Sequence, residues 1–148
     1  MIEVAPSVLA ADPLHVYRDV NRLVEAGAQV LHLDIMDGHF VPNLSFGPQL
    51  VAALRRDFPG LILDVHLMMS NPEHFIQAFS DAGADEITLH SEVKGDVPGM
   101  LGQIRQLGKK AGLSLKPATP VSEVQPYLKA CDLFLIMTVE PGFGGQKM

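Results

Sequence analysis

The fold is decided by a helix-to-strand joint that occurs twice in the chain. It reads Glu25-Ala26-Gly27-Ala28-Gln29-Val30-Leu31-His32 at its first occurrence and Asp81-Ala82-Gly83-Ala84-Asp85-Glu86-Ile87-Thr88-Leu89-His90 at its second. In both copies a glycine follows an amphipathic run, as it does at the end of a helix, and a short apolar run comes next. Repeated joints of this kind favour a closed (β/α) barrel over a doubly wound sheet.

The rest of the chain also alternates between short apolar runs and longer amphipathic runs. Asp12-Pro13 and Asn71-Pro72 are typical of helix starts, and Gly112 is expected to end a helix. We predict strands at residues 2–8, 29–35, 61–67, 86–89, 113–115 and 133–137, and helices at 13–26, 47–58, 72–82, 97–111 and 121–130. A complete (β/α)8 barrel takes about 250 residues. Residues 1–148 are therefore expected to form one barrel domain that lacks its C-terminal quarter.

The composition indicates a protein with no general affinity for polyanions or lipid. Its 148 residues are 47% hydrophobic and carry a formal net charge of −6, which gives no attraction to nucleic acid or to an anionic membrane. The single cysteine, Cys131, cannot form an intramolecular disulfide, and neither a signal peptide nor a long apolar run is present. We therefore expect a cytoplasmic protein without nucleic-acid or membrane partners. Backbone amides or a helix N-terminus would have to hold any anionic substrate locally.

Three side chains at the ends of neighbouring strands predict a metal site. His32 and Asp34 lie two residues apart in an expected strand, so they project from the same face. His66 has the equivalent position in the next strand. Two imidazoles and a carboxylate at a barrel mouth suit a divalent ion, Zn²⁺ or Fe²⁺ first and Mn²⁺ or Co²⁺ next. The alternative is a histidine and a carboxylate that satisfy each other in a polar interior.

Further residues are expected at the same mouth. Ser7 ends the first expected strand, where it either hydrogen-bonds substrate or caps a turn. Met36, Met68 and Met137 come at or just after strand ends, and they either fill the core or line the pocket. The loop Gly142-Phe143-Gly144-Gly145 has three glycines in four positions, which lets backbone N–H groups approach a phosphate.

Five motifs in the chain resemble those of the ribulose-phosphate 3-epimerase family. They are Ala5-Pro6-Ser7, the run from His32 to Asn43, Asp64 to Met68, Lys116 to Pro120, and Met137 to Gln146. The resemblance implies a TIM (β/α)8 barrel of the ribulose-phosphate-binding type, here truncated after about six strands. It also implies a metal-dependent isomerase of the pentose phosphate pathway. Such an enzyme interconverts D-ribulose 5-phosphate and D-xylulose 5-phosphate by deprotonation and reprotonation at C3.

The resemblance also assigns roles to individual residues. His32, Asp34 and His66 would bind the metal, and Asp34 would be one of two acid/base carboxylates flanking C3. Ser7 and His66 would contact substrate. Phosphate contacts and pocket lining would come from Gly142, Phe143, Gly144, Gly145, Met36, Met68 and Met137. The family's second carboxylate lies on strand seven in an Asp-Gly-Gly motif that these 148 residues lack. The chain by itself is therefore expected to have impaired activity.

Other functions are compatible with the same residues. An epimerase of a six-carbon ketose phosphate, such as allulose 6-phosphate, would use identical chemistry. A non-catalytic phosphosugar-binding subunit would account for the missing carboxylate. Another phosphate-binding barrel, such as a lyase or decarboxylase, is disfavoured because those enzymes tend to use a lysine or a metal-free site. Unpaired sheet edges predict a homo-oligomer.

Overall fold

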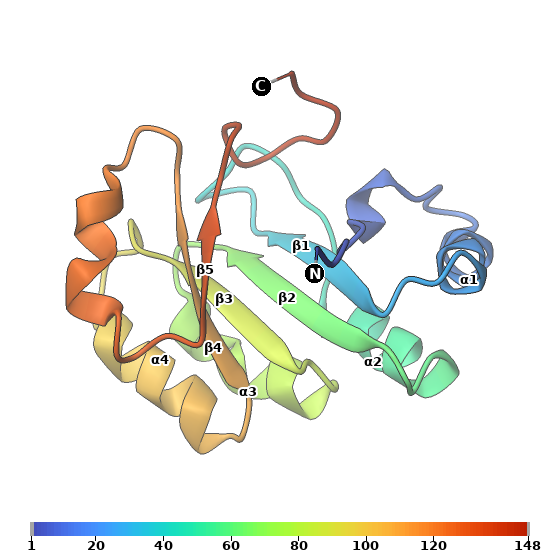
Figure 1. Cartoon of the computed structure of the whole chain (residues 1–148), viewed down its shortest axis with the longest axis horizontal. Helices are drawn as coiled ribbons and strands as arrows, with labels where there is room; N and C mark the ends of the chain where they lie inside the picture. Colours follow the sequence, from blue (N-terminus) through green and yellow to red (C-terminus); the bar gives the residue numbers. More distant parts are fainter. Residues whose placement is uncertain (1, 148) are drawn as a thin grey trace.

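The computed structural model describes residues 2–147 and shows a parallel sheet accompanied by helices (Figure 1). The strands in this part of the chain are β1 (Val30–Met36), β2 (Ile62–Met68), β3 (Glu86–His90), β4 (Lys110–Leu115) and β5 (Leu133–Ile136). They are ordered β1-β2-β3-β4-β5, each parallel to the next strand along the chain. Consecutive parallel pairing with intervening helices is TIM-barrel-like, which confirms the α/β barrel class predicted from the repeated joints.

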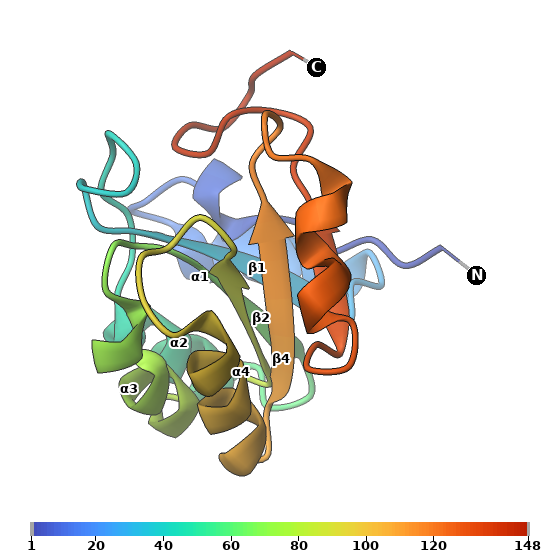
Figure 2. The same cartoon turned by 90° about the vertical axis from the view of Figure 1, so that its left-hand side faces the viewer.

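Helical segments alternate with the strands along the chain. The α-helices are α1 (Val16–Glu25), α2 (Pro48–Asp57), α3 (Ile76–Asp81) and α4 (Val97–Gln106), and the 3-10 turns are η1 (Val8–Ala10), η2 (Pro72–His74) and η3 (Val121–Tyr127). Helices α2, α3 and α4 lie side by side against one face of the sheet (Figure 1, Figure 2). Within residues 2–147, no helix has the length and apolar character needed to span a membrane.

The central residues of β1 and β2 alternate between apolar and polar side chains. Core side chains that are fully buried include Leu31, Leu33, Leu63, Val65 and Leu89, and they form one cluster with apolar residues of α2, α3 and α4. The alternate positions carry His32 and Asp34 on β1, and Asp64 and His66 on β2. The register pairs His32 with Asp64 and Asp34 with His66, so the polar side chains of the two strands are direct neighbours.

The expected first strand at residues 2–8 is wrong. Ser7 makes a single parallel bridge to His32, and η1 begins at the next residue. Pro6 has no N–H and contributes only its carbonyl, which accepts the His32 N–H at 3.0 Å. The Ser7 hydroxyl then accepts the Leu9 N–H at 3.2 Å and starts η1, so the extended segment ends there.

Several helix boundaries also differ from the expected ones. The Asp12 carboxylate accepts the Leu14 N–H at 3.0 Å and lies 2.7 Å from His15 Nδ1, which makes a separate turn before α1 begins at Val16. Residues 72–82 divide into η2 and α3 instead of forming one helix. Residues 121–127 form a 3-10 turn, since Pro126 lies within it and lacks the N–H that an α-helix needs.

Gly112 lies inside β4 and does not end a helix as predicted. Helix α4 stops at Gln106, and Gly108 provides the left-handed turn with a φ of +74°. Strand β4 therefore begins at Lys110, earlier than the expected start at residue 113. A Cβ on Gly112 would overlap the hydroxyl of Thr88 in β3. The position therefore needs glycine for close approach of two strands.

Candidate functional site

The register of β1 and β2 brings the three predicted metal ligands together. Asp34 is the direct partner of His66 across the strand pair, and His32 precedes Asp34 on the same face. Asp34 Oδ1 lies 3.2 Å from His32 Nε2 and 3.2 Å from His66 Nδ1. One ligand atom from each residue lies within 4.8 Å of the other two, which is close enough to share one ion.

Two further polar side chains, Asp64 and Ser7, orient the metal donors by hydrogen bonds. The Asp64 carboxylate accepts a hydrogen bond from His32 Nδ1 at 2.7 Å, and this bond directs Nε2 toward Asp34. Ser7 Oγ donates to Asp34 Oδ2 at 2.6 Å, which leaves Oδ1 facing the two imidazoles. Outer hydrogen bonds of this kind orient the ligands of metal sites. Two imidazole nitrogens and a carboxylate oxygen fit a divalent ion such as Zn²⁺ or Fe²⁺.

The charges of the three donors are strongly coupled. Burial lowers the pKa of His32, but hydrogen bonds to Asp34 and Asp64 outweigh burial and raise this pKa to about 10. Burial opposes ionisation of Asp34, yet the hydrogen bonds of His32, His66 and Ser7 bring its pKa well below the usual range. Burial lowers the pKa of His66 to about 4, against the opposing hydrogen bond with Asp34. His66 is therefore neutral at physiological pH, and a metal ion would have to displace a proton from His32.

A cavity of about 360 Å³ opens beside these donors. His32, Asp34 and His66 line it, together with every residue predicted for substrate contact, phosphate binding and pocket lining: Ser7, Met36, Met68, Met137, Gly142, Phe143, Gly144 and Gly145. The structure thus brings the whole predicted set around one space, while the role of each side chain stays a prediction. A histidine–carboxylate pair that only satisfied itself would need no such cavity.

The side-chain amides of Asn43 and Gln146 fix the conformation of the glycine loop (residues 142–145) that follows β5. Gly142 has a φ of +132°, a backbone conformation that favours glycine. Gln146 Nε2 donates to the carbonyls of Glu140 and Phe143 at 2.7 and 2.9 Å. Asn43 Nδ2 donates to the Gly142 carbonyl at 2.8 Å. The loop is therefore tied both to itself and to the segment that follows β1.

Four of the residues that build this region had no role in the sequence analysis: Asp64, His90, Glu92 and Asn43. The order Asp64-Val65-His66 repeats the polar-apolar-polar alternation of His32-Leu33-Asp34, so spacing alone contains a signal for Asp64. His90 also carries a signal, because it ends a strand as a histidine. Glu92 has no local signal for its contacts with Lys116 and Thr119, because both residues are more than twenty positions away in the sequence.

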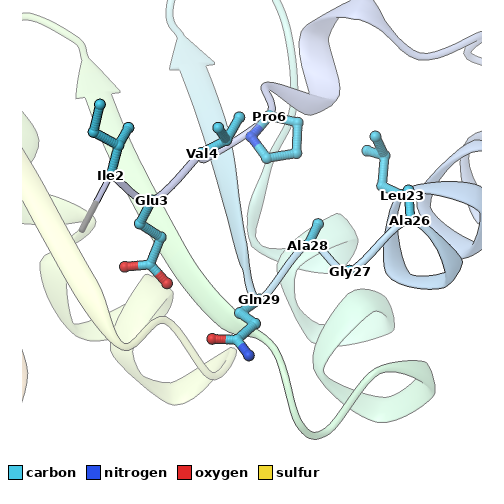
Figure 3. Close-up of a pocket in the computed structure, with 9 residues that line it drawn as sticks. All are labelled: Ile2, Glu3, Val4, Pro6, Leu23, Ala26, Gly27, Ala28 and Gln29. Atoms are coloured by element: carbon cyan, nitrogen blue, oxygen red, sulfur yellow. The ribbon is translucent and has the colours of Figure 1, made fainter.

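A larger cavity of about 570 Å³ lies at the opposite end of β1 (Figure 3). Its lining comes from the N-terminal segment and from the joint between α1 and β1. Among the residues that line it, Glu3 is the one with an ionisable side chain, and none belongs to the metal donor set. Cavity size therefore does not identify the site in this molecule, whereas the grouping of donors does.

The fold and the donor set define a TIM-barrel-like α/β protein with a candidate ligand site near the carboxyl ends of its strands. Solved structures agree on the fold. The tryptophan synthase alpha chain of Legionella pneumophila subsp. pneumophila matches with a TM-score of 0.63 at 17% identity, covering 93% of this chain and 62% of that one. A Yersinia pestis DHPS matches with a TM-score of 0.62 at 18% identity, covering 99% and 61% respectively.

Sequence comparison gives the family. Residues 3–148 match the ribulose-phosphate 3 epimerase family, and the chain belongs to it, which confirms the resemblance of the five motifs. The chain is 45% identical to the ribulose-phosphate 3-epimerase of Bacillus subtilis (strain 168) and 48% identical to that of Synechocystis sp.. It is 44% identical to a protein of Oryza sativa subsp. japonica named ribulose-phosphate 3-epimerase, cytoplasmic isoform. The matches cover 99%, 98% and 98% of this chain, but only 67%, 64% and 65% of those relatives.

Proposed function

We propose that this chain provides the metal-binding centre and one acid/base carboxylate of a ribulose-phosphate 3-epimerase. The reaction is the interconversion of D-ribulose 5-phosphate and D-xylulose 5-phosphate, a step of the pentose phosphate pathway in the cytoplasm. The observation that carries the proposal is the convergence of His32, Asp34 and His66 on a cavity shared with a glycine loop. Family membership supports the substrate class.

In this proposal His32 Nε2, Asp34 Oδ1 and His66 Nδ1 are the atoms that would hold a divalent ion, with Zn²⁺ or Fe²⁺ best suited. Held there, the ion would stabilise the negative charge that develops on the sugar oxygens as the C3 proton leaves, an effect worth several kcal/mol. Every other part of the reaction falls to side chains and amides of the protein.

Asp34 is proposed to move the C3 proton on one face of the sugar. Its Oδ2 is held at 2.6 Å by the Ser7 hydroxyl, so the carboxylate has a fixed orientation. Inversion also needs a second acid on the opposite face. Among residues 2–147, the metal donor group contains a single carboxylate. We therefore expect the 148-residue chain, assayed alone, to bind ligand with little turnover.

The remaining cavity residues are proposed to hold and enclose the substrate. The backbone amides of residues 142–145 would bind the phosphate, in a protein whose net charge of −6 offers no general attraction to it. Met36 and Met68 are buried in a small apolar cluster with Val41 and would exclude water from the reacting carbons. We also expect the protein to act as a homo-oligomer.

The test is C3 epimerisation of D-ribulose 5-phosphate by the purified chain, with and without added Zn²⁺ or Fe²⁺, alongside calorimetry of metal and phosphosugar binding. Asp34→Asn is the informative variant, and Asp57→Asn, at an exposed helix position, is its matched control. Metal-dependent binding that weakens in Asp34→Asn supports the proposal, and turnover lost in the same variant extends it to catalysis. A folded chain that binds neither metal nor phosphosugar refutes it. Parallel assays with allulose 6-phosphate decide between a five-carbon and a six-carbon substrate.

A further inference from the structure

The glycine loop has its carbonyl groups bound and its N–H groups available. Asn43 Nδ2 donates to the Gly142 carbonyl at 2.8 Å, and Gln146 Nε2 donates to the carbonyls of Glu140 and Phe143 at 2.7 and 2.9 Å. Within residues 2–147, nothing accepts a hydrogen bond from the N–H groups of residues 142–145. Two side chains therefore satisfy the acceptors of this stretch and leave its donors for another group.

The two side-chain amides contact the loop from outside the cavity. Residues 142–145 line the cavity, whereas Asn43 and Gln146 do not. The carbonyls of Gly142 and Phe143 therefore point away from the cavity, toward their donors. In a trans peptide the C=O and the following N–H point in opposite directions, and no peptide bond among the described residues is cis. The N–H groups of Phe143 and Gly144 are thus directed toward the cavity.

The direction of these N–H groups matters because the cavity offers few other donors to an anion. The described residues that line it include no lysine or arginine. Neighbouring backbone N–H groups that point the same way form a concavity in which an anion can bind. A loop whose peptides could turn freely would have to be ordered by the anion, at a cost in conformational entropy. A loop that is already ordered binds the anion without that cost.

The segment between β1 and α2 that carries Asn43 is itself fixed by hydrogen bonds. Asp37 Oδ1 accepts the N–H groups of His39 and Phe40, each at 2.8 Å, and Asp37 pairs with Leu44 in an isolated antiparallel bridge. Asn43 Oδ1 accepts the Leu44 N–H at 2.9 Å, which leaves the amide nitrogen to donate. A carbonyl bound to a donor on so constrained a segment cannot turn freely.

We propose that Asn43 and Gln146 are positioning residues that hold the glycine loop in its anion-binding conformation before a phosphate group arrives. Neither side chain touches the phosphate. Each acts through a carbonyl group whose direction sets that of the next N–H. The phosphate part of this inference rests on the proposed function. The pair therefore contributes to the affinity for a phosphate group and leaves the metal donors unaffected.

Backbone-amide NMR of the metal-free 148-residue chain tests the inference. Inorganic phosphate should shift the amide signals of Phe143 and Gly144, and its affinity should fall about 5- to 10-fold in Asn43→Ala, because the freed loop must then be ordered on binding. D-ribulose 5-phosphate should lose affinity by the same factor. Zn²⁺ affinity, measured separately by competition with a chelator, should not change. Asn71→Ala is the matched control, since this exposed asparagine follows β2 and its amide contacts His74 at 3.3 Å.

The possible outcomes separate this inference from the proposed function. A folded Asn43→Ala that binds phosphate as tightly as the parent, or that loses Zn²⁺ affinity to the same extent, overturns the positioning role and leaves the proposed function intact. A parent in which phosphate shifts no amide of the glycine loop also overturns the inference, while Zn²⁺ binding by that parent would still support the metal centre. Gln146→Ala decides if Asn43→Ala does not fold, because Gln146 is exposed and its loss should weaken phosphate binding in the same way. Unchanged phosphate affinity in that variant refutes the proposal.

Discussion

Replacing Gly112 by alanine should destabilise the sheet where β3, β4 and β5 meet. The added Cβ would overlap Thr88 Oγ1 and would lie 2.9 Å from Leu133 Cδ1. Thr88 is 1% exposed and β-branched, so its side chain has few alternative rotamers, whereas Leu133 is only half-buried and can move. Overpacking a buried site costs about 1–3 kcal/mol. We expect Gly112→Ala to lower the free energy of unfolding by about 2 kcal/mol.

Urea unfolding followed by circular dichroism measures this change. Gly102→Ala is the matched control, because nothing lies within 4 Å of a Cβ at that position of α4, and alanine is favoured there by about 1 kcal/mol. Thr88→Ala removes the overlapping hydroxyl, so Gly112→Ala should cost at least about 1 kcal/mol less in that background. A Gly112→Ala variant as stable as the parent, or an undiminished cost in the Thr88→Ala background, refutes the reasoning.

Three further predictions concern the site. Zn²⁺ binding at pH 7 should release about one proton, since the pKa of His32 is raised to about 10 and its nitrogen must be deprotonated to bind the ion. Calorimetry in buffers of different ionisation enthalpy counts the released protons, and a count of zero contradicts the assignment of His32 as a ligand. Ser7→Ala should lower stability by about 1 kcal/mol, because the hydroxyl caps η1 at Leu9 and also donates to Asp34, and Ser7→Thr should restore most of the loss in urea unfolding. Burial raises the pKa of Glu92, but hydrogen bonds from neighbouring groups outweigh burial and lower this pKa from 4.5 to about 2. This carboxylate therefore contributes stability above pH 4.5 that is lost as the pH falls toward 2. Acid unfolding of Glu92→Gln should therefore depend less on pH over that interval than acid unfolding of the parent.

The metal donor set is predictable from sequence because it depends on two regular features. Alternation along a strand places His32 and Asp34 on one face of β1, and the same spacing places Asp64 and His66 on one face of β2, in register with the first pair. Asp34 and His66 therefore become direct partners without any contribution from loops. The same regularity accounts for the correct class of fold.

The errors occur where a single residue or a distant contact decides the structure. Pro6 removes an N–H from the first segment, and Asp12 binds nearby amides before α1 can begin. Gly112 has the sequence context of a helix end, but the packing of β4 against Thr88 determines its place. Two of the hydrogen bonds of Glu92 come from a loop more than twenty residues away, and no local pattern encodes them.

The hydrogen bond from Asn43 to the Gly142 carbonyl also has a consequence for the order of folding. Every strand pairs with its neighbour in sequence, so the sheet can grow from one end by short-range steps. The Asn43–Gly142 contact instead closes a loop of 99 residues, for which chain entropy costs about 4 kcal/mol if it forms before the sheet. It is therefore expected to form last. The glycine loop should be the first part of the cavity to open in hydrogen exchange, and a bound phosphate would slow that opening.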